Sequence, residues 1–245
     1  MSVRGSLRSY LPWLARDWAL EKAPLPTLVG LAFGYLTVAS VMSFAGNDPA
    51  RLASMAPRFF SQVMDAVIWF AAVASATGVA ATDRERGTVR FLFSKPIDPA
   101  SYYLAQWCVA GAGTLLLAGL GAALLRAAGI HGSLLGTLGA MASAWLLLGG
   151  VGFLVNQLIN RDGVLYVALI VISFVSRSEA ASAVLPRWVT KGGVALLPLN
   201  ELDRVRQALY QSDAPLTHDL VHVLAYGAVA FVAGLLVLQR RALAR

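Results

Sequence analysis

Apolar residues run along this 245-residue chain in long blocks, and charged residues are gathered in the short segments between the blocks. The blocks show no strict alternation, which argues against strands that face lipid on one side only. About 20 apolar helical residues cross a hydrocarbon core of ~30 Å. A segment in lipid must satisfy its own backbone hydrogen bonds, so each long block is predicted to be a membrane-spanning helix.

The blocks predict an all-α, polytopic membrane protein with six transmembrane helices in a single transmembrane domain, residues 1–245. The predicted spans are Pro26–Ala45, Phe59–Thr82, Tyr102–Leu125, Leu134–Ile159, Gly163–Ser176 and Leu220–Leu238. The fifth is short, because its 14 charge-free residues make only ~21 Å of helix at ~1.5 Å per residue. It crosses only if Asp162 and Arg177 lie near the two interfaces or are sheltered.

Two further segments have mixed patterns. Residues 1–24 carry a stripe of Leu, Tyr and Trp with arginines away from it, which predicts an amphipathic helix along the membrane interface. Pro12 is comfortable only near a helix start, so a start near Leu11 is an alternative to an earlier one. The segment 177–219 places Trp188 among prolines and apolar residues. Short helices in the outer leaflet are predicted there, with a solvated connector as the alternative.

Basic residues set the predicted orientation. With six spans both termini lie on one side of the membrane, and that side carries twelve lysines and arginines against eight on the other. Positive residues concentrate in the cytoplasm, so both termini and the loop 83–99 are predicted to be cytoplasmic in a multi-pass cell (inner) membrane protein. The margin is narrow because the segment 177–219 carries five basic residues on the opposite side.

Composition agrees with this pattern. Hydrophobic residues make up 58% of the chain and charged residues 13%, about half of the ~25% that is usual in soluble domains. The net charge of +7 lies at the ends of apolar spans, so it is interpreted as topological and no nucleic-acid partner is predicted. The single Cys108 excludes an internal disulfide and is expected to be a small buried side chain.

Candidate catalytic and metal-binding groups are scarce. His218 and His222 are four residues apart, but no third ligand accompanies them. The motifs Gly-x-Ser-x-Gly, His-Glu-x-x-His and the phosphate-binding Gly-x-x-x-x-Gly-Lys-Ser/Thr do not occur. We therefore predict no enzyme activity, metal or cofactor in this chain, and any ATP that drives it must bind another polypeptide.

Polar residues inside the predicted spans are the next candidates. Asp65 is the acid best flanked by apolar sequence, and an unpaired charge at a helix centre costs ~2.5–3.5 kcal/mol. It either reaches the outer headgroups or lines a cavity and couples an ion. Asn156 either bonds to neighbouring helices or lines a substrate pathway. Small residues spaced every four positions from Gly132 to Ala144 indicate close helix packing or dimerisation.

The loop after the second predicted span has the most distinctive sequence, Asp83-Arg84-Glu85-Arg86-Gly87-Thr88-Val89-Arg90-Phe91-Leu92-Phe93-Ser94-Lys95-Pro96-Ile97. Gly87 permits a sharp exit from the span, and Thr88 can cap a new helix. Phe91 and Leu92 give that helix an apolar face, and Pro96 ends it. A short amphipathic helix on a cytoplasmic loop is suited to docking into a groove of another protein. A charge cluster that only sets topology is the alternative.

This loop resembles the one between the second and third spans of ABC-2 type transporter permeases. The shared pattern is acidic-basic-Glu-x-Gly-Thr, then an apolar pair and a Pro-Ile, with matching positions at Asp83, Glu85, Gly87, Thr88 and Pro96. The six-span plan and the flanking amphipathic and outer helices are also similar, so the resemblance covers essentially the whole chain. The family often has Glu where this chain has Asp83, and a Leu pair where it has Phe91-Leu92-Phe93. The first difference keeps the negative charge, and the second keeps the apolar face.

The resemblance implies that the loop is a coupling helix that contacts a cytoplasmic ABC ATPase subunit, which holds ATP and Mg. The coupling residues that it implies are Asp83, Arg84, Glu85, Arg86, Gly87, Thr88, Phe91, Leu92 and Pro96. It also implies an exporter in which two permease subunits pair in the lipid, as a homodimer or with a paralogue. An ion-gradient-driven secondary transporter that uses Asp65, or an intramembrane enzyme, are the competing hypotheses.

Overall fold

All secondary structure in the described part of the chain is helical. The computed structural model describes residues 3–45, 49–76, 98–158, 197–211 and 217–243. These residues form helices α1 (Val3–Glu21), α2 (Pro24–Ala45), α3 (Pro49–Ala76), α6 (Pro99–Ala127), α7 (Leu134–Leu158), α11 (Leu199–Tyr210) and α12 (Thr217–Leu243). The predicted all-α class is confirmed for these ranges.

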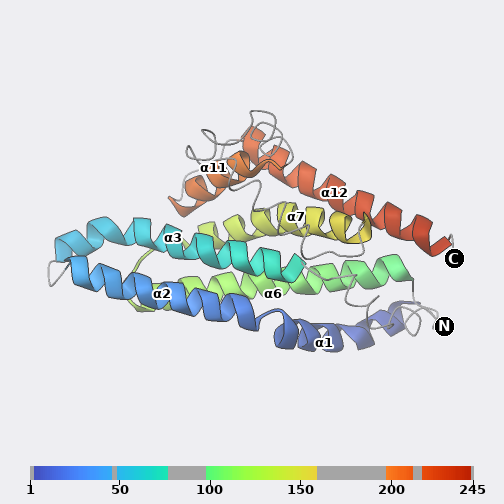
Figure 1. The fold of residues 1–245 in the computed structure, drawn as a ribbon, viewed down its shortest axis with the longest axis horizontal. Coiled ribbons are helices and arrows are strands. Elements are labelled where there is room, and N and C mark those ends of the chain that lie inside the picture. Colours follow the sequence, from blue (N-terminus) through green and yellow to red (C-terminus); the bar gives the residue numbers. More distant parts are fainter. Residues whose placement is uncertain (1–2, 46–48, 77–97, 159–196, 212–216, 244–245) are drawn as a thin grey trace, which may run out of the picture.

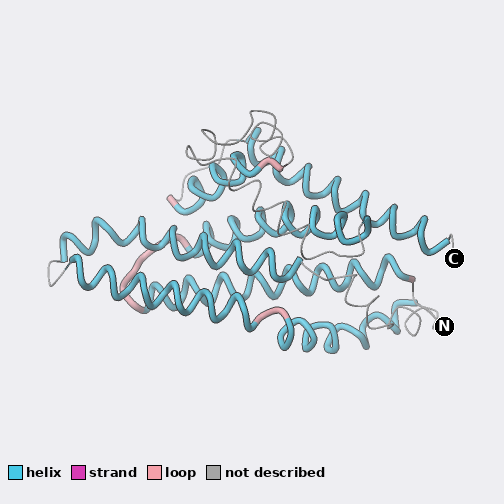
Figure 2. Tube along the Cα trace, in the orientation of Figure 1, coloured by secondary structure: helices cyan, strands magenta, loops and turns pink. Residues whose placement is uncertain are grey.

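The long helices lie side by side in an elongated bundle, and both chain ends lie at the same end of it (Figure 1). α12 packs most extensively against α7, while α3 contacts α2, α6 and α7. α11 lies along one edge, against α7 and α12. Short links join α1 to α2 and α6 to α7 (Figure 2).

In the described part of the chain, four helices are long and apolar enough to cross a membrane, Ser54–Ala76, Pro99–Ala127, Leu134–Leu158 and Thr217–Arg240. A fifth crossing results if Tyr10–Glu21 and Pro24–Ser40, which are bent by 47° at a short break, count as one span. These helices indicate a membrane-embedded protein. The predicted span Gly163–Ser176 lies outside the described residues, so the count of six stays a prediction.

The starts of α1 and α3 bear on two predictions. α1 begins at Val3 and passes through Pro12, so the alternative start near Leu11 is wrong. α3 begins at Pro49, well before Phe59, and contains Pro57. Proline suits the first position of a helix, because an N–H group at that position would have no intrahelical partner. Apolar pattern alone does not detect such starts, since the turns before the span carry exposed residues such as Arg58.

α6 ends in a turn that directs the chain toward α7. Gly129 has φ +83°, the left-handed region that favours glycine. Its N–H donates to the Arg126 carbonyl, and the Ile130 N–H donates to the Leu125 carbonyl. This pair of bonds is the Schellman closure of a helix, which is typically accompanied by an apolar contact. Leu125 and Ile130 are both buried in the main core, so the turn is held in place by packing.

The main core lies between α3, α6 and α7 and includes residues from α11 and α12. On the outer side of α6, Leu116, Leu120 and Leu124 are 68%, 61% and 60% exposed. Their four-residue spacing makes an apolar stripe that suits contact with lipid chains. Cys108 continues the same spacing and is exposed, so its expected burial is wrong. The pattern could not decide which face of an apolar helix is buried.

Glycines let α7 and α12 cross with their backbones in contact. A Cβ atom placed on Gly150 would collide with the carbonyl oxygen of Gly227. A Cβ atom on Gly227 would collide with the Leu146 carbonyl oxygen. Close approach of this kind stabilises helix pairs in lipid, where burial of apolar surface between helices gives little driving force.

The small residues from Gly132 to Ala144 pack inside the chain. Any Cβ on Gly132 would collide with the ring of Phe60, and one on Gly136 with the backbone of Leu209. The alanines of the row are also buried. In the described part of the chain, this row therefore serves internal packing.

The N-terminal helix packs against the bundle, and Trp18 makes the most specific contact. The Trp18 indole Nε1 donates to the Ser75 hydroxyl of α3 at 3.1 Å. The same ring lies against Gly113 of α6, where a Cβ atom would collide with it. Leu14 is also buried, while Arg16 is exposed. α1 therefore has an apolar face, and that face packs against α6.

We predict that Gly227→Ala destabilises the bundle by about 1–3 kcal/mol, because the added methyl group forces α7 and α12 apart. Gly34→Ala is the matched control, since a Cβ at Gly34 has no neighbour within 4 Å. Thermal unfolding of the two detergent-purified variants measures the difference. Equal midpoints would show that the α7–α12 crossing tolerates separation.

Candidate functional site

The predicted coupling residues from Asp83 to Pro96 lie outside the described residues. The structure describes the helices on either side of them. α3 ends at Ala76 and α6 begins at Pro99, and both of these ends point toward the end of the bundle that holds the chain termini (Figure 1).

Asp98 caps the start of α6. Its Oδ2 atom accepts hydrogen bonds from the Ser101 N–H at 2.9 Å and from the Ser101 hydroxyl at 2.7 Å. Pro99 occupies a first-turn position, where proline is favoured. The bond from the Ser101 side chain, with help from the backbone amides, lowers the pKa of Asp98 below its usual value of 3.8. This cap fixes the residue at which the chain re-enters the bundle.

Asp65, the predicted substrate-pathway or coupling acid, bonds to α11. The Tyr210 hydroxyl donates to Asp65 Oδ1 at 3.0 Å. Arg206 Nη1 lies 3.3 Å from the same oxygen. The Asp65 side chain is 38% exposed, whereas that of Arg206 is only 5% exposed. Asp65 therefore holds a buried cation in place, and it is neither unpaired nor simply directed at solvent.

Arg206 is the centre of this cluster. It also pairs with Asp203 one turn earlier on α11, and its guanidinium carbon lies 5.3 Å from the centre of the Trp69 ring. A guanidinium over an aromatic face is favourable, more so when the cation is removed from water. The cluster holds one more carboxylate than guanidinium. Removing Arg206 would therefore take away a cation that contacts both Asp65 and Asp203.

Tyr210 completes the contact between α11 and α3. Burial raises the pKa of its phenol well above the usual value, and the negative charge of Asp65 raises it further. The phenol therefore stays protonated and acts as a donor to Asp65. Its ring packs edge-on against Phe60 at a centroid distance of 6.3 Å. One turn of α11 thus gives α3 both a polar and an aromatic contact.

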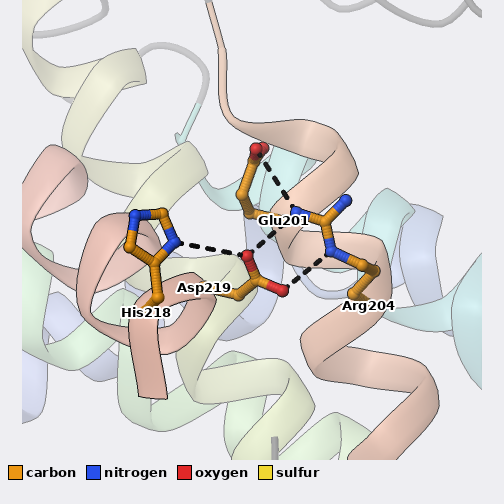
Figure 3. A network of polar contacts seen from close by, with 4 residues as sticks. All are labelled: Glu201, Arg204, His218 and Asp219. Carbon is orange, nitrogen blue, oxygen red and sulfur yellow. Dashed lines mark hydrogen bonds and ion pairs between the residues drawn. The ribbon is translucent and has the colours of Figure 1, made fainter. Parts of the chain in front are cut away.

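A second polar network joins α11 to the start of α12 (Figure 3). Arg204 forms a bidentate pair with Asp219, with Nε–Oδ2 at 2.7 Å and Nη2–Oδ1 at 2.9 Å. Glu201 lies 3.5 Å from the same guanidinium, and His218 Nδ1 lies 3.7 Å from Asp219. The bond to Asp219 raises the already high pKa of Arg204. Planar two-bond pairing fixes direction as well as distance.

These contacts tie α11 to three helices. Arg206 and Tyr210 connect it to α3, and Arg204 connects it to α12. The backbone at Leu209 lies directly over Gly136 of α7. The arrangement suits a rigid joint between helices. No group of three or more His, Cys, Asp or Glu side chains in the described ranges could hold a metal ion.

Asn156, the other predicted pathway residue, is fully buried. Its Nδ2 atom donates to the carbonyl oxygen of Ala76 at 2.9 Å. The described bond of Asn156 therefore joins α7 to the end of α3.

The sequence pattern did not identify Arg204, Arg206 or Tyr210. A signal was present, because residues four apart lie on the same helix face, which places Arg206 and Tyr210 together. The pattern could not show that the face meets Asp65, which is 145 residues away from Tyr210 along the chain.

No protein-family model matches this chain, and no curated protein matches it.

We predict that Asp65 and Arg206 are energetically coupled. In a double-mutant cycle with Asp65→Asn and Arg206→Gln, Arg206→Gln should be the more damaging single change because it removes a buried cation that contacts two carboxylates. The double variant should lose about 0.5–3 kcal/mol less stability than the two single losses added together. Thermal unfolding in detergent gives the values, and Arg58→Gln, an exposed arginine on α3, is the control. Strictly additive effects would mean that the pair does not hold α11.

We predict a pH-dependent effect of Asp98→Ala. At neutral pH the variant should lose about 1 kcal/mol of stability, as is usual for loss of an N-terminal cap. The pKa of Asp98 is lower in the folded chain than the usual 3.8, so its stabilisation is present above that value and is lost as pH falls through the lowered pKa. Unfolding of both proteins between pH 7 and 3 tests this. A difference that stays constant with pH would contradict it.

Proposed function

We propose that this chain is the membrane-spanning permease subunit of an ATP-driven transporter of the ABC-2 exporter type, coupled to a separate cytoplasmic ATPase subunit. The observation that carries the proposal is the motif from Asp83 to Pro96, which resembles the coupling loop of that family. The apolar helices on both sides of it, α3 and α6, suit a loop that enters and leaves a membrane.

The arrangement of the chain ends supports the same topology. Both termini lie at one end of the bundle, and α3 and α6 point their loop-side ends toward it (Figure 1). The excess of basic residues is predicted on this side, which makes it the cytoplasmic side of a cell (inner) membrane. An ATPase in the cytoplasm can then reach the loop.

ATP and Mg belong to the partner in this proposal, because the chain has no phosphate-binding loop. Two permease subunits, identical or paralogous, pair in the lipid, and each docks one ATPase. Movement of the loop helix then switches the central pathway between inward and outward access. α3 transmits that movement, since it leads into the loop and carries Asp65, which pairs with Arg206 of α11.

A secondary transporter driven by an ion gradient is the alternative. It needs a carboxylate that binds and releases an ion, and Asp65 would be that group. The Asp65 carboxylate instead contacts a buried guanidinium and a phenol donor. That pairing weighs against the alternative. To bind a transported ion, Asp65 would have to break its pair with the buried Arg206 in every transport cycle and form it again afterwards.

We predict that replacing Gly87 and Thr88 with bulky residues, as in Gly87→Leu with Thr88→Leu, abolishes stimulation of the ATPase. The larger side chains would block the sharp exit from the span and remove the helix cap. ATP hydrolysis by the reconstituted complex is the measurement. Membrane insertion of the variant should be unchanged, and Gly34→Leu is the matched bulky control.

Normal coupling in the Gly87 and Thr88 variant would remove the loop from the mechanism. Affinity purification of the wild-type chain is the complementary experiment, and it should bring down a protein with a phosphate-binding loop. Reproducible purification with no ATPase would count against the whole proposal.

A further inference from the structure

A pocket of about 750 Å³ opens at the end of the bundle away from the chain termini. Residues from the start of the α3 span, the link between α6 and α7, and the end of α11 line it. Small-molecule sites in proteins usually enclose ~300–1,000 Å³, so the volume suits a ligand larger than a simple ion. The functional assignment above makes no use of this pocket.

The charged side chains that line the pocket are basic. Arg126 lies in the last turn of α6, His131 follows in the link to α7, and both are exposed. The described residues that line the pocket include no carboxylate. Among the described residues, neither Arg126 nor His131 forms an ion pair. The pocket therefore presents a positive charge with no counterion from the described chain.

The rest of the lining is apolar and aromatic. Phe60 and Tyr210 pack edge-on at the α3–α11 contact. Leu134 and Leu135 line the pocket where α7 begins, and Leu135 is 82% exposed. An exposed leucine beside an arginine is typical of the boundary between lipid headgroups and acyl chains.

We infer that this pocket binds an anionic phospholipid. Its phosphate would lie at Arg126 and His131, where a guanidinium can bind phosphate through two parallel hydrogen bonds. The first carbons of an acyl chain would lie over Leu134 and Leu135. A bound lipid would contact Tyr210, whose hydroxyl bonds to Asp65, and so would support the joint between α3 and α11.

The proposed ligand has both a negatively charged phosphate and an apolar tail. Three probes test whether the site needs each of these two parts. Phosphatidylglycerol vesicle lipid supplies both, phosphatidylcholine lacks net negative charge, and inorganic phosphate lacks a tail. Each is titrated into the full chain purified in a neutral detergent, and the thermal unfolding midpoint reports binding. We expect saturable stabilisation by phosphatidylglycerol and little by the other two.

Arg126→Gln and Arg58→Gln form a matched pair of variants. Both remove one exposed positive charge, and only Arg126 lines the pocket. One basic contact to an anionic lipid is worth ~1 kcal/mol, so Arg126→Gln should raise the half-saturating phosphatidylglycerol concentration about fivefold. Arg58→Gln should leave it nearly unchanged. Leu135→Gln should weaken lipid binding without creating a response to inorganic phosphate.

Three outcomes would overturn the inference. Equal losses in Arg126→Gln and Arg58→Gln would show general attraction to charged lipid and no site. Equal stabilisation by phosphatidylcholine would show that charge plays no part. Saturation by inorganic phosphate at the same concentration as lipid would identify a soluble-anion site. None of these measurements involves an ATPase, so they stand apart from the test of the proposed function.

Discussion

The structure depends on the need of a backbone in lipid to satisfy its hydrogen bonds within its own helices. Once the helices have formed, lipid offers them little reason to associate, so contact must come from close packing. The glycines of this chain provide that packing at specific crossings. Gly150 and Gly227 bring α7 and α12 together, and Gly136 lets the backbone of α11 lie on α7. Gly113 similarly makes room for the ring of Trp18, which attaches α1.

Charge adds direction to this packing at one end of the bundle. α11 has a polar sequence and could not hold its place by small residues alone. Arg204 and Arg206 pair with carboxylates on α12 and α3, and these pairs specify which helices α11 joins. Partly buried pairs are costly to break because one removed partner leaves a charge without compensation. α11 therefore fixes the distance between two helices that share few direct contacts.

Much of the helix pattern was predictable, while the contacts between helices were not. The ends of α6 lie within three residues of those expected from the apolar run, and Asp98, Pro99 and Gly129 form them in the structure. The early start of α3 was missed, because the polar turns before the span break the apolar run. Asp65 was recognised as unusual from its apolar neighbours, but Arg206 lies far along the chain and no local rule connects them. The span 163–176 and the loop 83–97 lie outside the described residues, so the sequence remains their only source.

α3 connects the two ends of the molecule on which the proposals rest. It leads into the loop proposed to meet an ATPase, and nearer its start it carries Asp65 and Phe60, which contact Arg206 and Tyr210 of α11. A helix moves as a stiff element, so displacement at the loop would change the contact with α11. The phospholipid pocket shares Phe60 and Tyr210 with that contact. By linkage, a lipid that prefers one position of α3 must itself bind with an affinity that depends on the state of the loop.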